Sequence, residues 1–205
     1  MMSKKDKCWI AFFSQSGKEI CDISEAIGRY PDVVLTDNTT ISKIDPRIIN
    51  CRKLIIRKYR NLNKFQQVRY YTEDIPVGRM FDDSTVITLN GWLNIVPGAV
   101  CKLLEGKIFN GHPGLIDRYE ELKGKDPQVR CFNNIEKYER VGSVVHVVTP
   151  GVDEGEIKYS SDVSSSECVD LDTTYKVLAG TSLRSWLQFF EKELGYNIKN
   201  EYIRN

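Results

Sequence analysis

Trp9-Ile10-Ala11-Phe12-Phe13-Ser14-Gln15-Ser16-Gly17, near the start of the chain, indicates the kind of fold to expect. Its first half is an apolar run typical of a buried strand, and residues 14–17 form a turn. A helical pattern of apolar side chains follows at Ile20, Ile23, Ala26 and Ile27, and it ends at Gly28 and Pro31. Strand, tight turn and helix in this order are the repeating unit of α/β proteins.

The same alternation continues along the chain. Strands are predicted at Val33–Thr36, Lys53–Ile56, Val68–Tyr71, Thr85–Leu89, Gly106–Asn110 and Gly142–Thr149, although Lys53–Ile56 also fits part of a helix. Helices are predicted at Ala99–Leu104 and at Tyr175–Leu194, which is strongly amphipathic. Ser160–Ser166 fits a loop or an edge segment. Continuously apolar strands separated by helices predict an α/β fold, with a mostly parallel sheet covered on both faces.

Length and composition indicate one soluble globular domain, residues 1–205, because 205 residues suit a single core. Hydrophobic residues make up 41% and charged residues 28%, and the net charge of +1 favours no nucleic-acid partner. No apolar run approaches the ~18 residues of a membrane span, so we expect a cytoplasmic protein. The six cysteines are scattered without a Cys-x-x-Cys pair, which favours reduced thiols and no metal site.

One short motif carries groups suited to catalysis. Asn110-Gly111-His112-Pro113-Gly114 supplies an amide and an imidazole, and Asp153 supplies a carboxylate further along the chain. Transfer of a formyl or acyl unit to an amine needs these three group types: one holds an oxyanion, one handles a proton and one orients the imidazole. Taken singly, each has a structural explanation, since asparagine is common in turns and a lone histidine is more often a core residue. His146 is the only other histidine.

The first turn could hold an anion. After a strand, Ser14, Gln15, Ser16, Gly17 and Lys18 bring free backbone N–H groups and the positive end of a helix to one place. The turn is neither a Walker loop nor a dinucleotide-binding turn. Because α/β proteins are generally built with such turns, a purely structural role and an anion site are about equally supported.

Residues 110–153 in their context resemble the folate-dependent formyltransferases, and most closely those that act on glycinamide ribonucleotide. The resemblance rests on Asn110-x-His112-Pro113, the strand Val141–Thr149, and Val152-Asp153-x-Gly155. It extends to Phe13–Gly17, which looks like the substrate phosphate loop, and to Leu89–Val96, which looks like the segment that holds the pterin.

The resemblance implies a doubly wound domain that passes the formyl group of 10-formyltetrahydrofolate to a primary amine, in one-carbon metabolism and purine biosynthesis. Asn110 would then donate to the formyl oxygen, His112 would shuttle protons, and Asp153 would orient His112 and a water. Folate would lie against Trp92, Asn94, Val96 and His146, with backbone rather than side chains in contact at 94 and 96. Ser14, Gln15, Ser16, Gly17 and Lys18 would bind the acceptor.

The acceptor class stays open at this level. Gln15 stands where nucleotide-specific members usually have glycine, and Gly114-Leu115-Ile116-Asp117 lacks the usual turn proline. His112-Pro113-Gly114 and Gly124-x-x-Pro127 are similar to members that formylate amino sugars, and Gly124-x-x-Pro127 is also similar to the methionyl-tRNA formyltransferases. We expect the acceptor to be a small phosphorylated amine such as glycinamide ribonucleotide, with an amino-sugar nucleotide as the alternative. Two other classes remain: a catalytically silent folate- or RNA-binding relative that uses the basic stretch 52–69, and a hydrolase that releases formate. Solvation of that basic stretch is the commoner explanation.

Overall fold

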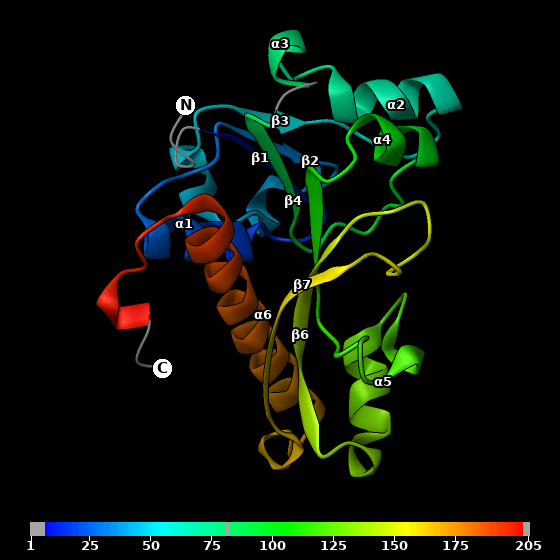
Figure 1. The fold of residues 1–205 in the computed structure, drawn as a ribbon, viewed down its shortest axis with the longest axis vertical. Helices are drawn as coiled ribbons and strands as arrows, with labels where there is room; N and C mark the ends of the chain where they lie inside the picture. The colour runs from blue at the N-terminus through cyan, green and yellow to red at the C-terminus, as the bar shows by residue number, and fades with distance from the viewer. Residues whose placement is uncertain (1–6, 81–82, 203–205) are drawn as a thin grey trace.

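A seven-stranded sheet with the order β3-β2-β1-β4-β5-β6-β7 organises the molecule (Figure 1). The computed structural model describes residues 7–80 and 83–202. The strands are β1 (Cys8–Phe13), β2 (Val33–Thr36), β3 (Leu54–Ile56), β4 (Thr85–Leu89), β5 (Ile108–His112), β6 (Arg140–Val147) and β7 (Ile157–Ser164). The neighbouring strands from β3 through β2, β1 and β4 to β5 pair in parallel, whereas β6 pairs antiparallel with both β5 and β7.

Helices cover both faces of this sheet, as the alternating sequence predicts. They are α1 (Lys18–Ile27), α2 (Lys64–Thr72), α3 (Val77–Met80), α4 (Gly98–Leu103), α5 (Pro127–Asn133) and α6 (Leu171–Leu194). Side chains of α1 and α6 pack on one face with Trp9 and Phe13, whereas α2 and α4 pack on the other with Ile10 and Phe12. The doubly wound, mostly parallel α/β fold is therefore confirmed.

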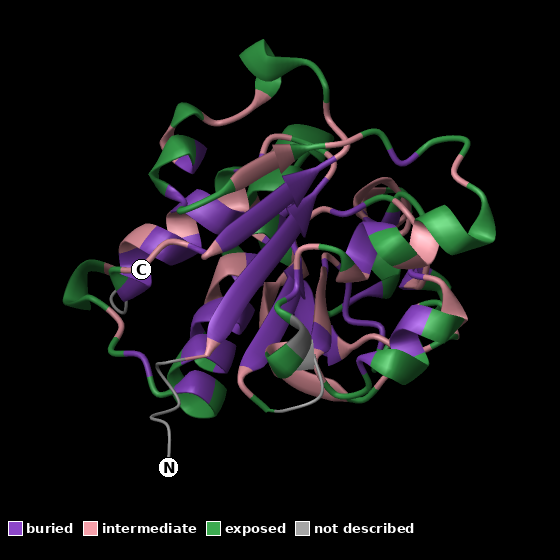
Figure 2. Cartoon of the chain, turned by 90° about the horizontal axis from the view of Figure 1, so that it is seen from above, coloured by how far each residue is buried: buried purple, intermediate pink, exposed green. Residues whose placement is uncertain are grey.

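Burial is deepest in the middle of the sheet. All residues of β1 and β4 are buried, and Figure 2 shows the buried colour along strands in the middle of the sheet. A third cluster, which includes Leu115, Val144 and Leu178, lies under the antiparallel strands. α6 approaches β6 closely through small polar residues: the Ser143 hydroxyl donates to the Leu178 carbonyl at 2.8 Å. These bonds satisfy polar groups that a large apolar side chain at this contact would displace.

Val68–Tyr71 is helical, so the prediction of a strand there is wrong. These residues form the end of α2, where Tyr70 and Tyr71 are buried. Asn63 caps the helix, because its side chain accepts from the Gln66 N–H while the Gln66 side chain accepts from the Asn63 N–H. This reciprocal cap is visible in the sequence as Asn-x-x-Gln, and it indicates a helix start that the apolar run by itself does not reveal.

Two strand boundaries differ from the prediction in ways that matter for the site. β5 ends at His112 rather than Asn110, so Asn110 and His112 both lie inside the strand, and Pro113 and Gly114 follow it. Ser160–Ser166 falls largely in β7, which confirms the edge alternative and leaves the loop alternative wrong for most of the segment. All six cysteines are buried and free. In residues 7–80 and 83–202, no helix combines the length and apolarity needed to cross a membrane.

Candidate active site

β5 places Asn110 and His112 on the same face of the sheet, because alternate residues of a strand point the same way. The neighbouring strand β6 aligns His146 directly with Asn110. The Asn110 amide nitrogen lies 3.1 Å from His146 Nε2. Three polar side chains from two adjacent strands therefore meet at one point of the sheet.

Asp153 reaches this point from the loop after β6. Its backbone is left-handed, with φ of 53°, which aspartate tolerates better than most residues. Gly155 allows the loop to turn back, since a Cβ there would lie 1.7 Å from the Val147 carbonyl oxygen. The Asp153 carboxylate consequently lies 3.3 Å from His112 Nδ1 and 3.3 Å from His146 Nε2.

Backbone carbonyls fix the protonation pattern of both histidines. His112 Nε2 lies 2.9 Å from the Leu122 carbonyl, and His146 Nδ1 lies 2.9 Å from the Val147 carbonyl. A carbonyl only accepts, so each of these ring nitrogens carries the hydrogen. The nitrogen that faces Asp153 is then unprotonated in the neutral ring, and it gains a proton only when the imidazole becomes cationic.

Burial and nearby charges have opposite effects on the pKa values of His112 and Asp153. Burial lowers the pKa of His112, although the Asp153 carboxylate counteracts part of that effect. For Asp153, burial alone would raise the pKa, but His146, His112 and the Gly124 N–H together hold it below its usual value. The ground state thus has a neutral His112 beside an ionised Asp153, poised to accept one proton.

The segment after β5 closes the site without the usual turn proline. The Gly114 N–H donates to the His112 carbonyl at 2.9 Å, and the Ile116 N–H donates to the Gly114 carbonyl at 3.0 Å. Further on, the Gly124 N–H donates to Asp153 Oδ2 at 2.8 Å. The guanidinium of Arg130 on α5 donates to the carbonyls of residues 121, 122 and 123. Arg130 therefore fixes the segment 121–124, whose backbone contacts both His112 and Asp153.

Gly111 allows Trp186 of α6 to pack closely against β5 at the motif. A Cβ on Gly111 would lie 2.5 Å from Nε1 of the buried Trp186. We expect Gly111→Ala to lower the free energy of unfolding by about 1–3 kcal/mol, because the rigid indole cannot yield without moving α6 or β5. Denaturant unfolding measures this loss. A stability equal to that of the wild type would show that the helix shifts freely.

The geometry agrees with a match to a known family. The model of the formyl transferase family matches residues 53–179, which is more than half of the chain. The chain belongs to the formyl transferase family. No match to a curated protein was found.

Solved structures of formyltransferases share the fold. Glycinamide ribonucleotide transformylase 1 from Geobacillus kaustophilus is similar with a TM-score of 0.74 and 19% identity, covering 92% of this chain and 99% of that one. The enzyme of the same name from Symbiobacterium toebii has a TM-score of 0.72 and 19% identity, covering 89% and 85%. Phosphoribosylglycinamide formyltransferase from Coxiella burnetii, in complex with CHES, has a TM-score of 0.72 and 16% identity, covering 94% and 90%.

The segment after β4 divides between core and surface. Trp92 is buried among Phe12, Tyr59 and Tyr70, and its indole N–H donates to the Tyr71 hydroxyl at 2.8 Å. Its side chain therefore packs in the core. Val96 is buried as well, and the Asn94 amide donates to Asp37 at 2.9 Å. In this formyltransferase, the side chains of Leu93 and Ile95 are 71% and 70% exposed.

The first turn lies against this segment. The Ser14 N–H donates to the Gly91 carbonyl at 3.1 Å, and the Ser14 hydroxyl accepts from the Leu93 N–H at 3.1 Å. A cavity of about 410 Å³ beside the turn is lined by Ser14, Gln15, Ser16, Asn38, Thr40 and Lys43. Gly17 has φ of 73° and precedes α1, while Lys18 extends away and forms an ion pair with Asp22.

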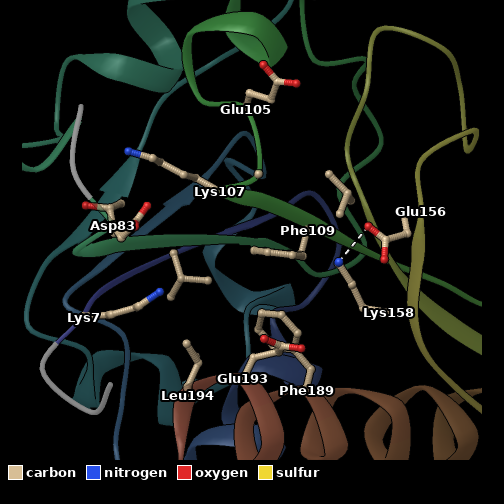
Figure 3. Close-up of a pocket in the computed structure, with 14 residues that line it drawn as sticks. Lys7, Asp83, Glu105, Lys107, Phe109, Glu156, Lys158, Phe189, Glu193 and Leu194 are labelled. Carbon is tan, nitrogen blue, oxygen red and sulfur yellow. Dashed lines mark hydrogen bonds and ion pairs between the residues drawn. The ribbon is translucent and has the colours of Figure 1, made fainter. Parts of the chain in front are cut away.

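A second cavity, of about 400 Å³, lies at the opposite end of the parallel strands (Figure 3). Its lining combines lysines and carboxylates, among them Lys107, Glu156 and Lys158, over an aromatic floor of Phe109 and Phe189. Glu156 and Lys158 pair at 2.7 Å. It contains none of the motif residues. In the described part of the chain, no group of three His, Cys, Asp or Glu side chains could hold a metal ion.

The basic stretch 52–69 is partly neutralised by its own neighbours. Lys53 and Arg57 bind Asp74 at 2.8 and 2.9 Å, and Arg57 and Arg69 bind Glu73 at 3.1 Å each. Three of the basic side chains in the stretch are therefore paired with nearby carboxylates.

Two further polar residues near the motif, Glu19 and Asn90, were not predicted from the sequence; Asn90 is buried and Glu19 is partly exposed. Glu19, in the first turn of α1, accepts a hydrogen bond from the Asn90 amide at 2.9 Å. Asn90 directly follows β4, and this residue is 3% exposed. The only sequence signal was an acidic residue placed two positions after the turn glycine, where a helix favours negative charge.

Proposed function

We propose that this formyltransferase transfers the formyl group of 10-formyltetrahydrofolate to a primary amine of a small acceptor. The observation that carries the proposal is the convergence of Asn110, His112 and Asp153, with the carboxylate 3.3 Å from the imidazole. An amide donor, a neutral base and an orienting carboxylate are the groups that direct attack of an amine on a formyl carbon requires.

Asn110 is suited to stabilise the oxyanion. One N–H of its amide is directed at His146 Nε2, 3.1 Å away, which fixes the side chain. The second N–H is then available for the formyl oxygen as that atom becomes negative. A donor held in place before the reaction costs no reorganisation in the transition state.

His112 and Asp153 together handle the proton. The amine nitrogen forms a bond to the formyl carbon, and its proton passes to His112, directly or through one water. The cationic ring then has a donor facing Asp153, which stabilises it at 3.3 Å. When the tetrahedral centre collapses, the bond to the donor nitrogen breaks and that nitrogen takes the proton.

The exposed edge of the segment after β4 fits the folate donor. Leu93 and Ile95 present apolar surface outward, and the backbone between Trp92 and Val96 is held by Ser14 and by the Tyr59 hydroxyl, which donates to the Ile95 carbonyl at 3.2 Å. Apolar side chains beside fixed backbone groups suit a flat heterocycle with polar edges. We propose that Trp92, Asn94 and Val96 position this segment.

Formyl transfer is tested with 10-formyltetrahydrofolate and two acceptors. Glycinamide ribonucleotide comes first, because similar solved structures are those of glycinamide ribonucleotide transformylases, and its use would support a role in purine biosynthesis. An amino-sugar nucleotide is the second. Formate released without an acceptor would instead indicate a hydrolase, and donor binding without any turnover would indicate a silent relative.

The pH dependence of kcat/KM reports the proposed base. His112 must be neutral to accept a proton, and burial lowers its pKa below the ordinary value of 6.5. More than half of His112 should therefore be neutral at pH 6.5, and activity should fall to half only at a lower pH, as the pH drops through the lowered pKa. An acidic limb centred above pH 6.5 would contradict this assignment.

A further inference from the structure

A single backbone carbonyl holds the hydrogen on His112 Nε2. This carbonyl belongs to Leu122, which is 2% exposed, and its oxygen lies 2.9 Å from the ring nitrogen. Gly114 allows the close approach, because a Cβ there would lie 3.2 Å from Leu122 Cβ and 3.4 Å from His112 Nε2. The tautomer of the ring therefore depends on where this carbonyl lies, since the hydrogen bond at one ring nitrogen decides which nitrogen is protonated.

Arg130 binds the same carbonyl from α5. Its Nη2 donates to the carbonyl of Leu122 at 3.1 Å and to that of Lys123 at 2.8 Å, and its Nη1 donates to the carbonyl of Glu121 at 2.6 Å. The Leu122 oxygen can accept from the guanidinium and from the imidazole together, because a carbonyl oxygen has two lone pairs. Arg130 therefore fixes the position of the atom to which His112 donates.

The far end of the same segment binds Asp153. Gly124 has φ of 85°, which glycine adopts without strain, and its N–H donates to Asp153 Oδ2 at 2.8 Å. One end of the segment 121–124 thus contacts His112 and the other contacts Asp153. Because α5 packs on the core through buried residues, the Arg130 fork holds both contacts on a rigid element.

Arg130 binds carbonyls where other arginines of this chain bind acids. Arg118 and Arg140 each pair with a carboxylate, whereas in residues 7–80 and 83–202 no carboxylate pairs with Arg130. The Glu121 carboxylate accepts from the Tyr138 hydroxyl at 3.0 Å instead. Arg130 Nε is buried without a hydrogen-bond partner among the described residues. Such a group costs free energy, and proteins accept this cost mainly at functional sites.

Two acceptors compete for the one hydrogen of the neutral His112 ring. The Asp153 carboxylate lies 3.3 Å from Nδ1, and the Leu122 carbonyl lies 2.9 Å from Nε2. A carboxylate is the stronger acceptor, so a Leu122 carbonyl that could move away would lose the hydrogen to Nδ1. Nδ1 would then donate to Asp153 and could not accept a proton, and the basic nitrogen would be Nε2, which faces the segment 121–124.

We propose that Arg130 is a positioning residue for formyl transfer: by fixing the Leu122 carbonyl, it keeps the hydrogen of neutral His112 on Nε2 and leaves Nδ1 as the nitrogen that accepts the proton of the amine. This inference rests on the proposed function and adds to it a residue outside the sequence motif. The charged and titratable groups that face His112 are Asp153 in the loop after β6, His146 on β6 and Arg130 on α5.

NMR of the imidazole nitrogens tests the proposal without any substrate. The chain has only two histidines, and in the structure their hydrogens lie on different nitrogens: Nε2 of His112 and Nδ1 of His146. At a pH well above 6.5, the wild type should therefore show one histidine of each tautomer. In Arg130→Met, both histidines should carry the hydrogen mainly on Nδ1. A His112 that keeps its hydrogen on Nε2 in Arg130→Met overturns the proposal.

Kinetics of three variants separate geometry from charge. Arg130→Met should lower kcat about 10–100-fold, the range found when an outer partner of an oriented histidine is removed. Arg130→Lys keeps the charge, but one ammonium cannot reproduce a planar fork on three carbonyls, so it should also lose rate and change the tautomer. Arg118→Met, which removes an equal charge at the Asp162 ion pair, should keep the wild-type tautomer and a kcat within about twofold.

Thermal unfolding and the dissociation constant of the folate donor check that each variant keeps its fold, and both should stay close to the wild-type values. Wild-type kcat and tautomer in Arg130→Lys would overturn the proposal, because the fork would then be unnecessary. A changed tautomer in Arg130→Met, in a protein whose wild type transfers no formyl group, would reject the proposed function and leave the control of the His112 ring by Arg130 intact.

Discussion

Replacement of Asn110 by alanine is expected to lower kcat about 10²–10³-fold, while the dissociation constant of the folate donor changes by no more than a few-fold. The reason is that the amide N–H acts on the oxyanion, which exists only in the transition state. Loss of one such donor typically costs about 2.7–4 kcal/mol of transition-state stabilisation. Steady-state kinetics and equilibrium binding of the donor measure the two effects separately.

Asn110→Asp provides the matched comparison. It keeps the size of the side chain, removes both N–H donors and adds a carboxylate near Asp153, so it should be at least as inactive as the alanine variant. If either variant kept kcat within about fivefold of the wild type, the formyl oxygen would be stabilised elsewhere. A selective rise in KM with unchanged kcat would assign Asn110 to binding of the ground state.

Asp153→Asn is expected to reduce kcat by about 10³–10⁴-fold, the size of effect seen when the carboxylate that orients a catalytic histidine is neutralised. The carboxylate lies 3.3 Å from both histidines and stabilises the cation formed when a proton arrives. Folate binding should weaken by no more than a few-fold, because Asp153 acts on the proton and not on the pterin. Turnover equal to that of the wild type would remove Asp153 from the mechanism.

The pH profile distinguishes this role from a structural one. The Asp153 charge raises the pKa of His112 against the larger effect of burial. In Asp153→Asn this pKa should fall further, so the acidic limb of the residual activity should move to lower pH. Glu154→Gln, at an exposed neighbouring acid, should leave both rate and profile within about twofold of the wild type. An unmoved limb in Asp153→Asn would mean that another group titrates.

Much of the fold was predictable because local patterns and tertiary packing agree. β1, β2 and β4 are apolar runs buried on both faces, and α6 has an amphipathic pattern that packs on the sheet. Val68–Tyr71 was not predictable from its apolar run, because two adjacent buried tyrosines fit a strand as well as a helix. The cap at Asn63, outside that run, settled the choice.

The sequence by itself determined the family and the three groups named for the chemistry, since the motif Asn110-x-His112 and the later Asp153 are written in the chain. Only the tertiary structure decided how they meet. The antiparallel register sets His146 opposite Asn110, and the turn through Gly155 brings Asp153 between two imidazoles. Glu19 shows the same limit more strongly, because its partners Asn90 and Ser182 lie 71 and 163 residues away in the sequence. Contacts and protonation depend on distance in space, which a spacing along the chain does not give.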